Sequence, residues 1–247
     1  MGYKEENEIE KVLDEAQQHL FAVSQIHFKQ SFIPIRNVLS DAFDRIDELH
    51  KNKGQLRGLP TGFTQLDNLL AGLQKSDLVI LAARPSVGKT SLALDIVRHI
   101  ATKQKIPVGM FSLEMGKEQL VDRMLCSEAG IDLWRMRTGR LSDRPEDDDF
   151  PRIGHAIGVL SETPIYIDDS GSLNILQLRT KARRLQSEHG LGLIVIDYLQ
   201  LMDSTSGKTD NSVQEVAEIS RGLKALAREL NIPILALSQL SRTVEQS

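Results

Sequence analysis

The sequence predicts an α/β fold in which helices cover both faces of a mostly parallel sheet. Short apolar segments rich in β-branched residues alternate with amphipathic segments from residue 59 onward. A phosphate-binding pattern separates the first apolar segment from the first long amphipathic one, and a later apolar segment ends in an aspartate. Ligands of parallel α/β sheets bind at the carboxyl ends of the strands, so these patterns also predict where the site lies.

The periodicity of apolar residues gives the expected elements in order. We expect strands at residues 78–83, 107–113, 164–168, 192–197 and 233–238. We expect helices at residues 64–70, 89–103, 117–129, 149–160, 174–188 and 213–230. Before these, residues 5–29 and 38–49 have the pattern of amphipathic helices separated by Pro34. We therefore divide the chain into a helical arm with a connector (1–55) and a domain that carries the phosphate-binding pattern (56–247).

Composition excludes several classes of protein. The chain has 247 residues, of which 40% are hydrophobic and 26% charged, enough for a full-sized core. Its apolar runs are too short to span a membrane, and its acidic amino terminus does not resemble an export signal. The single cysteine, Cys126, excludes an internal disulfide and fits a core position in a cytoplasmic protein. The histidines lack zinc-ligand spacing, and the net charge of −4 neither predicts nor excludes nucleic-acid binding.

The stretch ARPSVGKT at residues 83–90 predicts a phosphate-binding loop, although Ala83 stands where the pattern has its first glycine. A helix that begins here offers free N–H groups and the positive end of its dipole to a triphosphate. We expect Gly88 to allow close approach of the backbone, Lys89 to reach the β and γ phosphates, and Thr90 to contact Mg²⁺. The alternative is a chance tripeptide at a helix cap.

Polar residues follow three of the expected strands. Asp197 ends the run LIVID and is a candidate for the Mg²⁺ shell, and Glu114 follows the strand at 107–113 and is a candidate base for water. Gln239 follows the last strand, where an amide can sense the γ-phosphate. On spacing alone, each of these could instead cap a turn or lie on the surface.

Several motifs together resemble the motor domain of the bacterial replicative DNA helicase of the DnaB type, within the RecA-like P-loop ATPases. These are ARPSVGKT, SLEM at 112–115, IDYLQLM at 196–202, ISRGLKALAREL at 219–230 and LALSQLSR at 235–242, with an opening Gly58–Phe63 and Leu66–Asp67. Alanine is common at the first motif position in that family. The resemblance covers nearly the whole chain, and residues 8–29 are similar to the family's linker helix.

The resemblance implies a role for each matching residue. Lys89, Thr90 and Asp197 are similar to the phosphate and metal contacts, Glu114 to the catalytic base and Gln239 to the γ-phosphate sensor. Further nucleotide contacts are expected from Ser86, Val87, Gly88, Ser91 and Arg123, the last near the base. Lys208, in the polar segment 203–211, is a candidate contact to single-stranded DNA, although the segment could be simply a flexible loop. The basic residues Arg179, Lys181, Arg183 and Arg184 are expected to form a solvated helix face.

The implied function is ATP hydrolysis, with Mg²⁺, at the subunit interfaces of a hexameric ring that moves on single-stranded DNA. The linker helix is expected to dock on a neighbouring subunit, and a loader protein is a possible partner. The resemblance places a primase-engaging domain before this chain and an arginine finger after it, so we expect weak hydrolysis from this stretch alone. The rival hypotheses are a non-catalytic docking module and a recombinase or clock-type relative.

Overall fold

The computed structural model describes residues 32–51, 56–144, 147–203 and 212–240. By its contacts the chain divides into two units, Met1–Gln55 and Leu56–Ser247. In the first unit, helix α2 spans Ile35–Lys51 and begins earlier than the predicted residue 38. Proline has a φ compatible with a helix start, and the N–H of Asn37 donates to the Pro34 carbonyl at 3.0 Å. The helix expected at 5–29 lies outside the described residues, and the roles of the two parts stay predictions.

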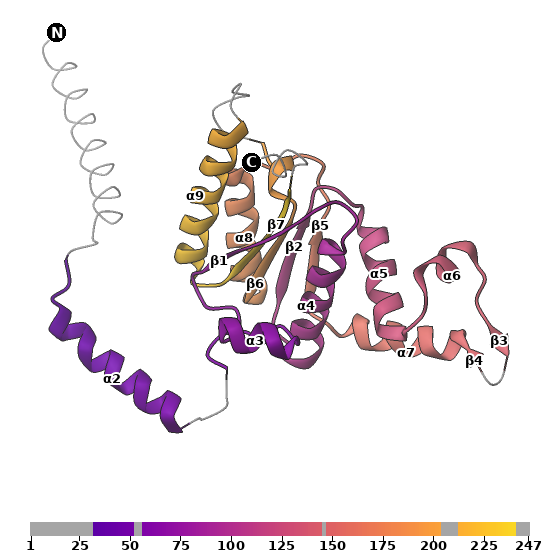
Figure 1. Ribbon diagram of the computed structural model, residues 1–247, viewed down its shortest axis with the longest axis horizontal. Coiled ribbons are helices and arrows are strands. Elements are labelled where there is room, and N and C mark those ends of the chain that lie inside the picture. Colours follow the sequence, from indigo (N-terminus) through magenta and orange to yellow (C-terminus); the bar gives the residue numbers. More distant parts are fainter. Residues whose placement is uncertain (1–31, 52–55, 145–146, 204–211, 241–247) are drawn as a thin grey trace, which may run out of the picture. The chain divides into compact units, whose positions relative to one another are not determined.

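A five-stranded parallel sheet in the order β1-β7-β6-β2-β5 forms the centre of the second unit (Figure 1). The strands are β1 (Leu78–Ala83), β2 (Val108–Ser112), β5 (Ile165–Asp168), β6 (Leu193–Asp197) and β7 (Ile234–Gln239). The predicted parallel sheet is thus confirmed. Strand β6 lies next to β2, with Asp197 opposite Ser112, so the polar residues that follow the two strands emerge at the same edge.

Helices connect these strands at the predicted positions. They are α3 (Thr64–Leu70), α4 (Lys89–Lys103), α5 (Lys117–Ala129), α7 (Asp149–Ser161), α8 (Ile175–His189) and α9 (Ser212–Leu230). Each of their ends falls within one residue of the prediction. No helix of the described ranges is long and apolar enough to cross a membrane.

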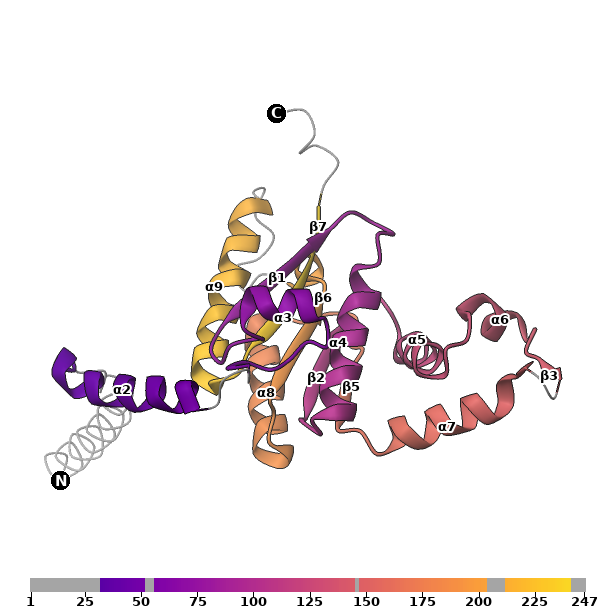
Figure 2. The same ribbon diagram turned by 60° about the horizontal axis from the view of Figure 1, so that its bottom comes forward.

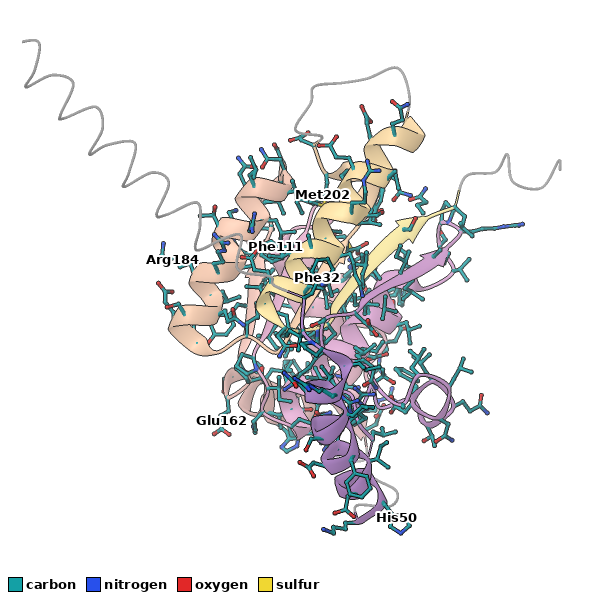
Figure 3. All side chains as sticks on the ribbon, turned by 90° about the vertical axis from the view of Figure 1, so that its left-hand side faces the viewer. Phe32, His50, Phe111, Glu162, Arg184 and Met202 are labelled. Atoms are coloured by element: carbon teal, nitrogen blue, oxygen red, sulfur yellow. The ribbon has the colours of Figure 1, made fainter. Side chains whose placement is uncertain are left out.

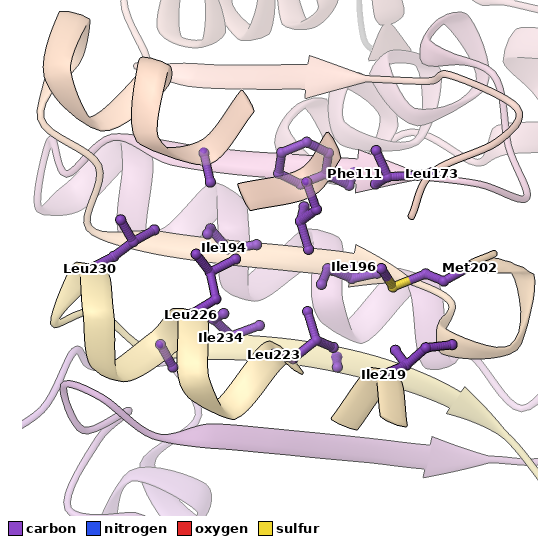
Figure 4. Close-up of a cluster of buried hydrophobic side chains, with 14 of the residues drawn as sticks. Phe111, Leu173, Ile194, Ile196, Met202, Ile219, Leu223, Leu226, Leu230 and Ile234 are labelled. Carbon is purple, nitrogen blue, oxygen red and sulfur yellow. The ribbon is translucent and has the colours of Figure 1, made fainter. Parts of the chain in front are cut away.

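The strand residues alternate between two cores, as the period of a pleated strand requires. Ile194 and Ile196 of β6 pack with buried residues of α8 and α9, such as Leu178 and Leu223 (Figure 4). Leu193 and Val195, on the opposite face, pack with α4 and α5. Helices therefore cover both faces of the sheet, as Figures 1 and 2 show. Because both faces are buried, β6 is a continuous apolar run rather than an alternating one.

Short elements between α5 and α7 were not predicted. They are α6 (Leu133–Thr138) and the hairpin of β3 (Asp143–Arg144) and β4 (Asp147–Asp148). The fully buried carboxylate of Asp149 holds them: it accepts from the Ser142 N–H at 2.8 Å and pairs with Arg135 at 2.6 Å and Arg152 at 3.5 Å. A buried charge is stable only when it is paired and hydrogen-bonded. The pair of Asp149 with Arg135, rather than a local apolar period, therefore stabilises α6 and the hairpin.

The opening segment and Cys126 both have structural roles. The buried carboxylate of Asp67 accepts hydrogen bonds from the Thr61 N–H at 2.7 Å and the Thr61 hydroxyl at 2.8 Å, which fixes the chain before α3. Cys126 is buried in α5, which confirms the expected core position. Burial, with the charges of Asp122 and Asp132, raises the pKa of its thiol and so disfavours the thiolate form.

Candidate nucleotide-binding site

The predicted phosphate loop connects β1 to α4 at the carboxyl edge of the sheet. Gly88 is the residue before α4 and has a φ of 100°, and Ser86 also has a positive φ of 64°. An added Cβ at Gly88 would meet no atom within 4 Å. In the described structure, therefore, it is the left-handed backbone and not crowding that calls for glycine at this position. No described side chain caps the start of α4, so its N–H groups face the loop.

Lys89 and Thr90, in the first turn of α4, both contact Asp197 at the end of β6. The Thr90 hydroxyl donates to Asp197 Oδ2 at 2.7 Å, and Lys89 Nζ lies 3.3 Å from Asp197 Oδ1. Asp197 is fully buried, and the side chain of Lys89 is 9% exposed. The two halves of the predicted motif, 107 residues apart in the sequence, thus meet in one cluster.

The neighbouring strand β2 brings Glu114 to the same edge. The N–H of Leu113 donates to the Asp197 carbonyl at 2.7 Å, which extends the β2–β6 ladder to the residue before Glu114. The hydroxyl of buried Ser112 donates to the Met115 carbonyl at 2.7 Å and closes the turn that carries Glu114. Glu114 itself is exposed at the end of this turn, where a carboxylate can reach a water molecule.

Gln239 ends β7, the strand between β1 and β6. Its backbone lies opposite Ala83, the last residue before the phosphate loop. On the other side, the amide of Gln200 donates from Nε2 to the Gln239 carbonyl at 3.0 Å. The predicted sensor is therefore held between the phosphate loop and the segment that follows Asp197.

A cavity of about 420 Å³ opens between these elements. Its lining comprises Ala83, Arg84, Pro85, Ser86, Gly88, Lys89, Thr90, Ser91, Glu114, Met115, Arg123 and Gln239. Nearly every residue predicted to contact nucleotide lines this cavity. Val87 lies outside the lining and is 70% exposed at the loop tip, so its side chain has no place in the cavity. Asp197 is not among the lining residues, but its carboxylate contacts two of them, Thr90 and Lys89.

Arg123 of α5 lines the same cavity. Its guanidinium donates to the Ser91 hydroxyl at 3.3 Å, while its buried Nε has no hydrogen-bond partner within the described chain. Arg123 and Ser91 also line a second cavity of about 400 Å³ between α4 and α5. The position is compatible with the predicted contact to a nucleotide base.

The residues fit a hard divalent cation such as Mg²⁺. Among the described atoms, Asp197 Oδ1 is a buried side-chain oxygen without a hydrogen-bond partner, even though Lys89 stands 3.3 Å away as an ion pair. Such an oxygen is costly unless a ligand completes its contacts. With the Thr90 hydroxyl it provides the oxygen donors that Mg²⁺ prefers when it binds together with phosphates.

Other contacts in this region were not predicted from the sequence. Lys89 Nζ lies 4.4 Å from the centroid of the Tyr198 ring, so a cation–π contact helps to fix the lysine. Tyr198, Gln200 and Ser112 all lie within the quoted motifs IDYLQLM and SLEM, which was the available signal. The partners of Tyr198 and Gln200 are Lys89 of α4 and Gln239 of β7, both far away in the sequence, so these two roles become visible only in the fold. Lys208 lies outside the described residues.

The basic residues of α8 lie on a partly to largely exposed helix face, as expected, and each also has an acidic partner. Arg179 and Arg183 pair with Glu229, and Lys181 pairs with Asp168. Arg184, labelled in Figure 3, pairs with Glu188 at 2.8 Å on the surface. Burial opposes ionisation of Glu229, but the hydrogen bonds from the two arginines bring its pKa below the ordinary value. This cluster therefore joins α8 to α9 and to β5.

Known proteins share both the sequence and this arrangement. Replicative DNA helicase DnaC of Bacillus subtilis (strain 168) is 50% identical over 99% of this chain and 53% of its own length, so the chain spans about half of that relative. Replicative DNA helicase DnaB of Geobacillus stearothermophilus is 51% identical, again over 99% of this chain and 53% of its own length.

Two solved structures have the same arrangement. One, described as an ATPase domain, is 32% identical, with a TM-score of 0.78 over 88% of this chain and 75% of that one. The other, a DnaB-like replicative helicase described with its interactions with primase, is 30% identical, with a TM-score of 0.76 over 96% of this chain and 59% of that one.

Residues 58–247, which include the whole cavity, match the family described as DnaB-like helicase C terminal domain. The parallel sheet with its phosphate loop is of the RecA type, and the solved relatives share it. With this fold and a family match over most of its length, the chain belongs to the DnaB-like helicase C-terminal domain family.

Proposed function

We propose that the intact protein is an ATP-dependent replicative DNA helicase and that this chain contains its motor. The observation that carries the proposal is the cluster of Lys89, Thr90 and buried Asp197 beneath a cavity that Glu114 and Gln239 also line. This combination provides positive charge for phosphates, oxygen donors for a metal and a carboxylate for water. The relationship to replicative helicases adds DNA unwinding to the nucleotide chemistry.

The γ-phosphate of ATP would lie at the start of α4. There the free N–H groups of the helix and the ammonium of Lys89 would stabilise its charge. Thr90 and Asp197 would hold Mg²⁺, directly or through water. When bound, Mg²⁺ supplies positive charge that offsets the charge on the phosphate oxygens.

Glu114 would act as the general base. A water oxygen forms a bond to the γ-phosphorus while its proton passes to the Glu114 carboxylate. The bond between the γ-phosphorus and the bridging oxygen breaks, and ADP leaves with the electron pair. Gln239 would hydrogen-bond the γ-phosphate, so that the end of β7 differs before and after hydrolysis.

The partners follow from this role. We propose single-stranded DNA as the track, contacted near Lys208, and a hexameric ring of identical subunits in which the linker helix docks on a neighbour. In such a ring a neighbour would supply the arginine finger, and a loader would place the ring on DNA in the cytoplasm. The DnaB-like neighbour that was solved with primase interactions supports a primase partner for the intact protein.

The test is ATP hydrolysis by the intact protein with and without single-stranded DNA. Lys89→Ala should lower turnover by at least about 10³-fold and weaken nucleotide binding, because it removes the cavity's buried ammonium. Glu114→Gln should lower turnover similarly but keep nucleotide binding, because the amide keeps its shape and cannot take a proton. Lys181→Ala is the matched control, since it also removes a lysine paired with a strand-end aspartate. Unchanged nucleotide binding in Lys89→Ala would favour the docking module instead.

A further inference from the structure

The end of β7 lacks part of its strand neighbour. Pairing between β6 and β7 runs from Ile194 opposite Ile234 to Ile196 opposite Ala236. Strand β7 continues to Gln239 and stays paired with β1 up to that residue. The chain after Asp197 turns instead into the short 3₁₀ helix η1 (Leu199–Leu201). The end of β7 that lines the nucleotide cavity is therefore supported by regular pairing on one side.

The side-chain amide of Gln200, in η1, supports the other side. Its Nε2 donates to the Ser238 hydroxyl at 2.9 Å and to the Gln239 carbonyl at 3.0 Å. Its Oε1 accepts from the Gln239 N–H at 3.3 Å. A primary amide offers both a donor and an acceptor, as a peptide group does. Gln200 thus makes with Gln239 the pair of hydrogen bonds that a neighbouring strand would otherwise provide.

This contact connects the cavity to the segment after β6. Gln239 lines the cavity, whereas Gln200 lies close in sequence to Asp197, at the metal end of the site. On its far side η1 is anchored, because the Asp203 N–H donates to the Leu173 carbonyl at 3.0 Å and its carboxylate accepts from Ser172 at 2.6 Å. Residues 204–211, predicted to face DNA, follow directly.

We propose that Gln200 is a positioning residue for hydrolysis. Its amide sets the position of Gln239 in the cavity, through the hydrogen bonds to the Gln239 carbonyl and N–H. This inference rests on the proposed role of Gln239. It concerns the specific amide of Gln200.

The first test is steady-state ATP hydrolysis by the intact protein, with and without oligo-dT. Gln200→Ala should lower kcat with DNA about tenfold, which corresponds to about 1.4 kcal/mol in the barrier. The KM for ATP should stay within about twofold, because Gln200 is absent from the cavity lining and contacts neither Lys89 nor Thr90. Gln200→Glu should show the same loss, since it keeps the volume but cannot donate to the Gln239 carbonyl.

A double-mutant cycle tests whether Gln200 acts through Gln239. If it does, Gln200→Ala combined with Gln239→Ala should be no slower than Gln239→Ala alone. Gln186→Ala is the matched control, because Gln186 also donates to a backbone carbonyl, that of Leu230 at 2.9 Å, near the opposite end of β7. That variant should hydrolyse ATP within about twofold of the parent protein. Binding of a fluorescent ADP at parent affinity shows that each variant is folded.

Three results would overturn the inference. These are a Gln200→Ala turnover within twofold of the parent, losses that multiply in the double variant, or an equal loss in Gln186→Ala. If Lys89→Ala and Glu114→Gln abolish turnover while any of these occurs, only the role of Gln200 fails. If Lys89→Ala and Glu114→Gln hydrolyse ATP normally, the proposed function fails first and this inference with it.

Discussion

Asp197 and Asp168 end the two strands that flank β2, one opposite Ser112 and the other opposite Phe111, and their surroundings differ. Each ends a parallel strand, β6 or β5, and each faces a lysine. Asp168 Oδ2 lies 2.5 Å from Lys181, and their side chains are 26% and 40% exposed. Asp197 Oδ1 lies 3.3 Å from Lys89, and these side chains are 0% and 9% exposed. The Asp197–Lys89 pair is thus more deeply buried than the Asp168–Lys181 pair, yet its charged atoms lie farther apart.

The difference lies in how completely each carboxylate is satisfied. Asp168 accepts from Lys181, from the Ser170 hydroxyl at 2.5 Å and from the Ser170 N–H at 3.0 Å. Burial opposes its ionisation, but these hydrogen bonds bring the pKa of Asp168 below its ordinary value. Asp197 keeps a buried oxygen without a hydrogen-bond partner among the described groups. A saturated ion pair stabilises the fold, whereas an unsaturated one beside a cavity is ready to bind a ligand.

The largest expected difference is in catalysis. Asp197→Asn should lower ATP turnover by about 10²- to 10³-fold, the size seen when one charge-stabilising group is removed from an active site. Asp168→Asn should leave turnover within about twofold. Steady-state hydrolysis of the two isosteric variants measures this. Equal losses in both would remove the distinction between a structural and a functional aspartate.

A smaller effect is expected on the metal dependence of nucleotide binding. Removal of Mg²⁺ with EDTA should weaken ATP binding by the parent protein roughly tenfold, since the oxygens of Thr90 and Asp197 then face uncompensated phosphates. Thr90→Val keeps the shape but removes the hydroxyl, so its affinities with and without Mg²⁺ should differ much less. Titration calorimetry with a non-hydrolysable ATP analogue gives both values. An undiminished Mg²⁺ effect in Thr90→Val would exclude that hydroxyl from the metal site.

The smallest expected effect is on stability at low pH. Because the folded-state pKa of Asp168 is lowered, its ion pair stabilises the fold above the unfolded pKa of about 3.9 and loses this effect as the pH falls through the folded value. Asp168→Asn should therefore lower the melting temperature at pH 6 by about 1–4 °C, the modest size expected for a partly exposed pair. The difference should shrink as the pH approaches 3. Thermal denaturation at several pH values, with Glu188→Gln as a surface control, decides this.

Local patterns specified most of the sheet and its helices. β6 and α4 were predicted closely because their apolar periods are strong and their ends are marked by Asp197 and Gly88. The region of α6 and its hairpin was missed because Asp149 stabilises it through Arg135, a residue 14 positions away whose contact no helical or strand period encodes. The cavity residues were predicted from their motifs, and the structure places them together. Tyr198 and Gln200, which contact Lys89 and Gln239, could not be assigned because each contacts a residue far away in the sequence.

The start of α4 has one more consequence for the behaviour of the whole domain. Gly88 precedes it in a left-handed conformation, and no described side chain caps it. A bound phosphate would take the place of such a cap, so occupancy of the cavity would become part of the folding energetics of the domain. Ligand at a hundredfold excess over its Kd would add about 2.7 kcal/mol of stability. Cellular nucleotide would then stabilise the folded domain in addition to being the substrate of hydrolysis.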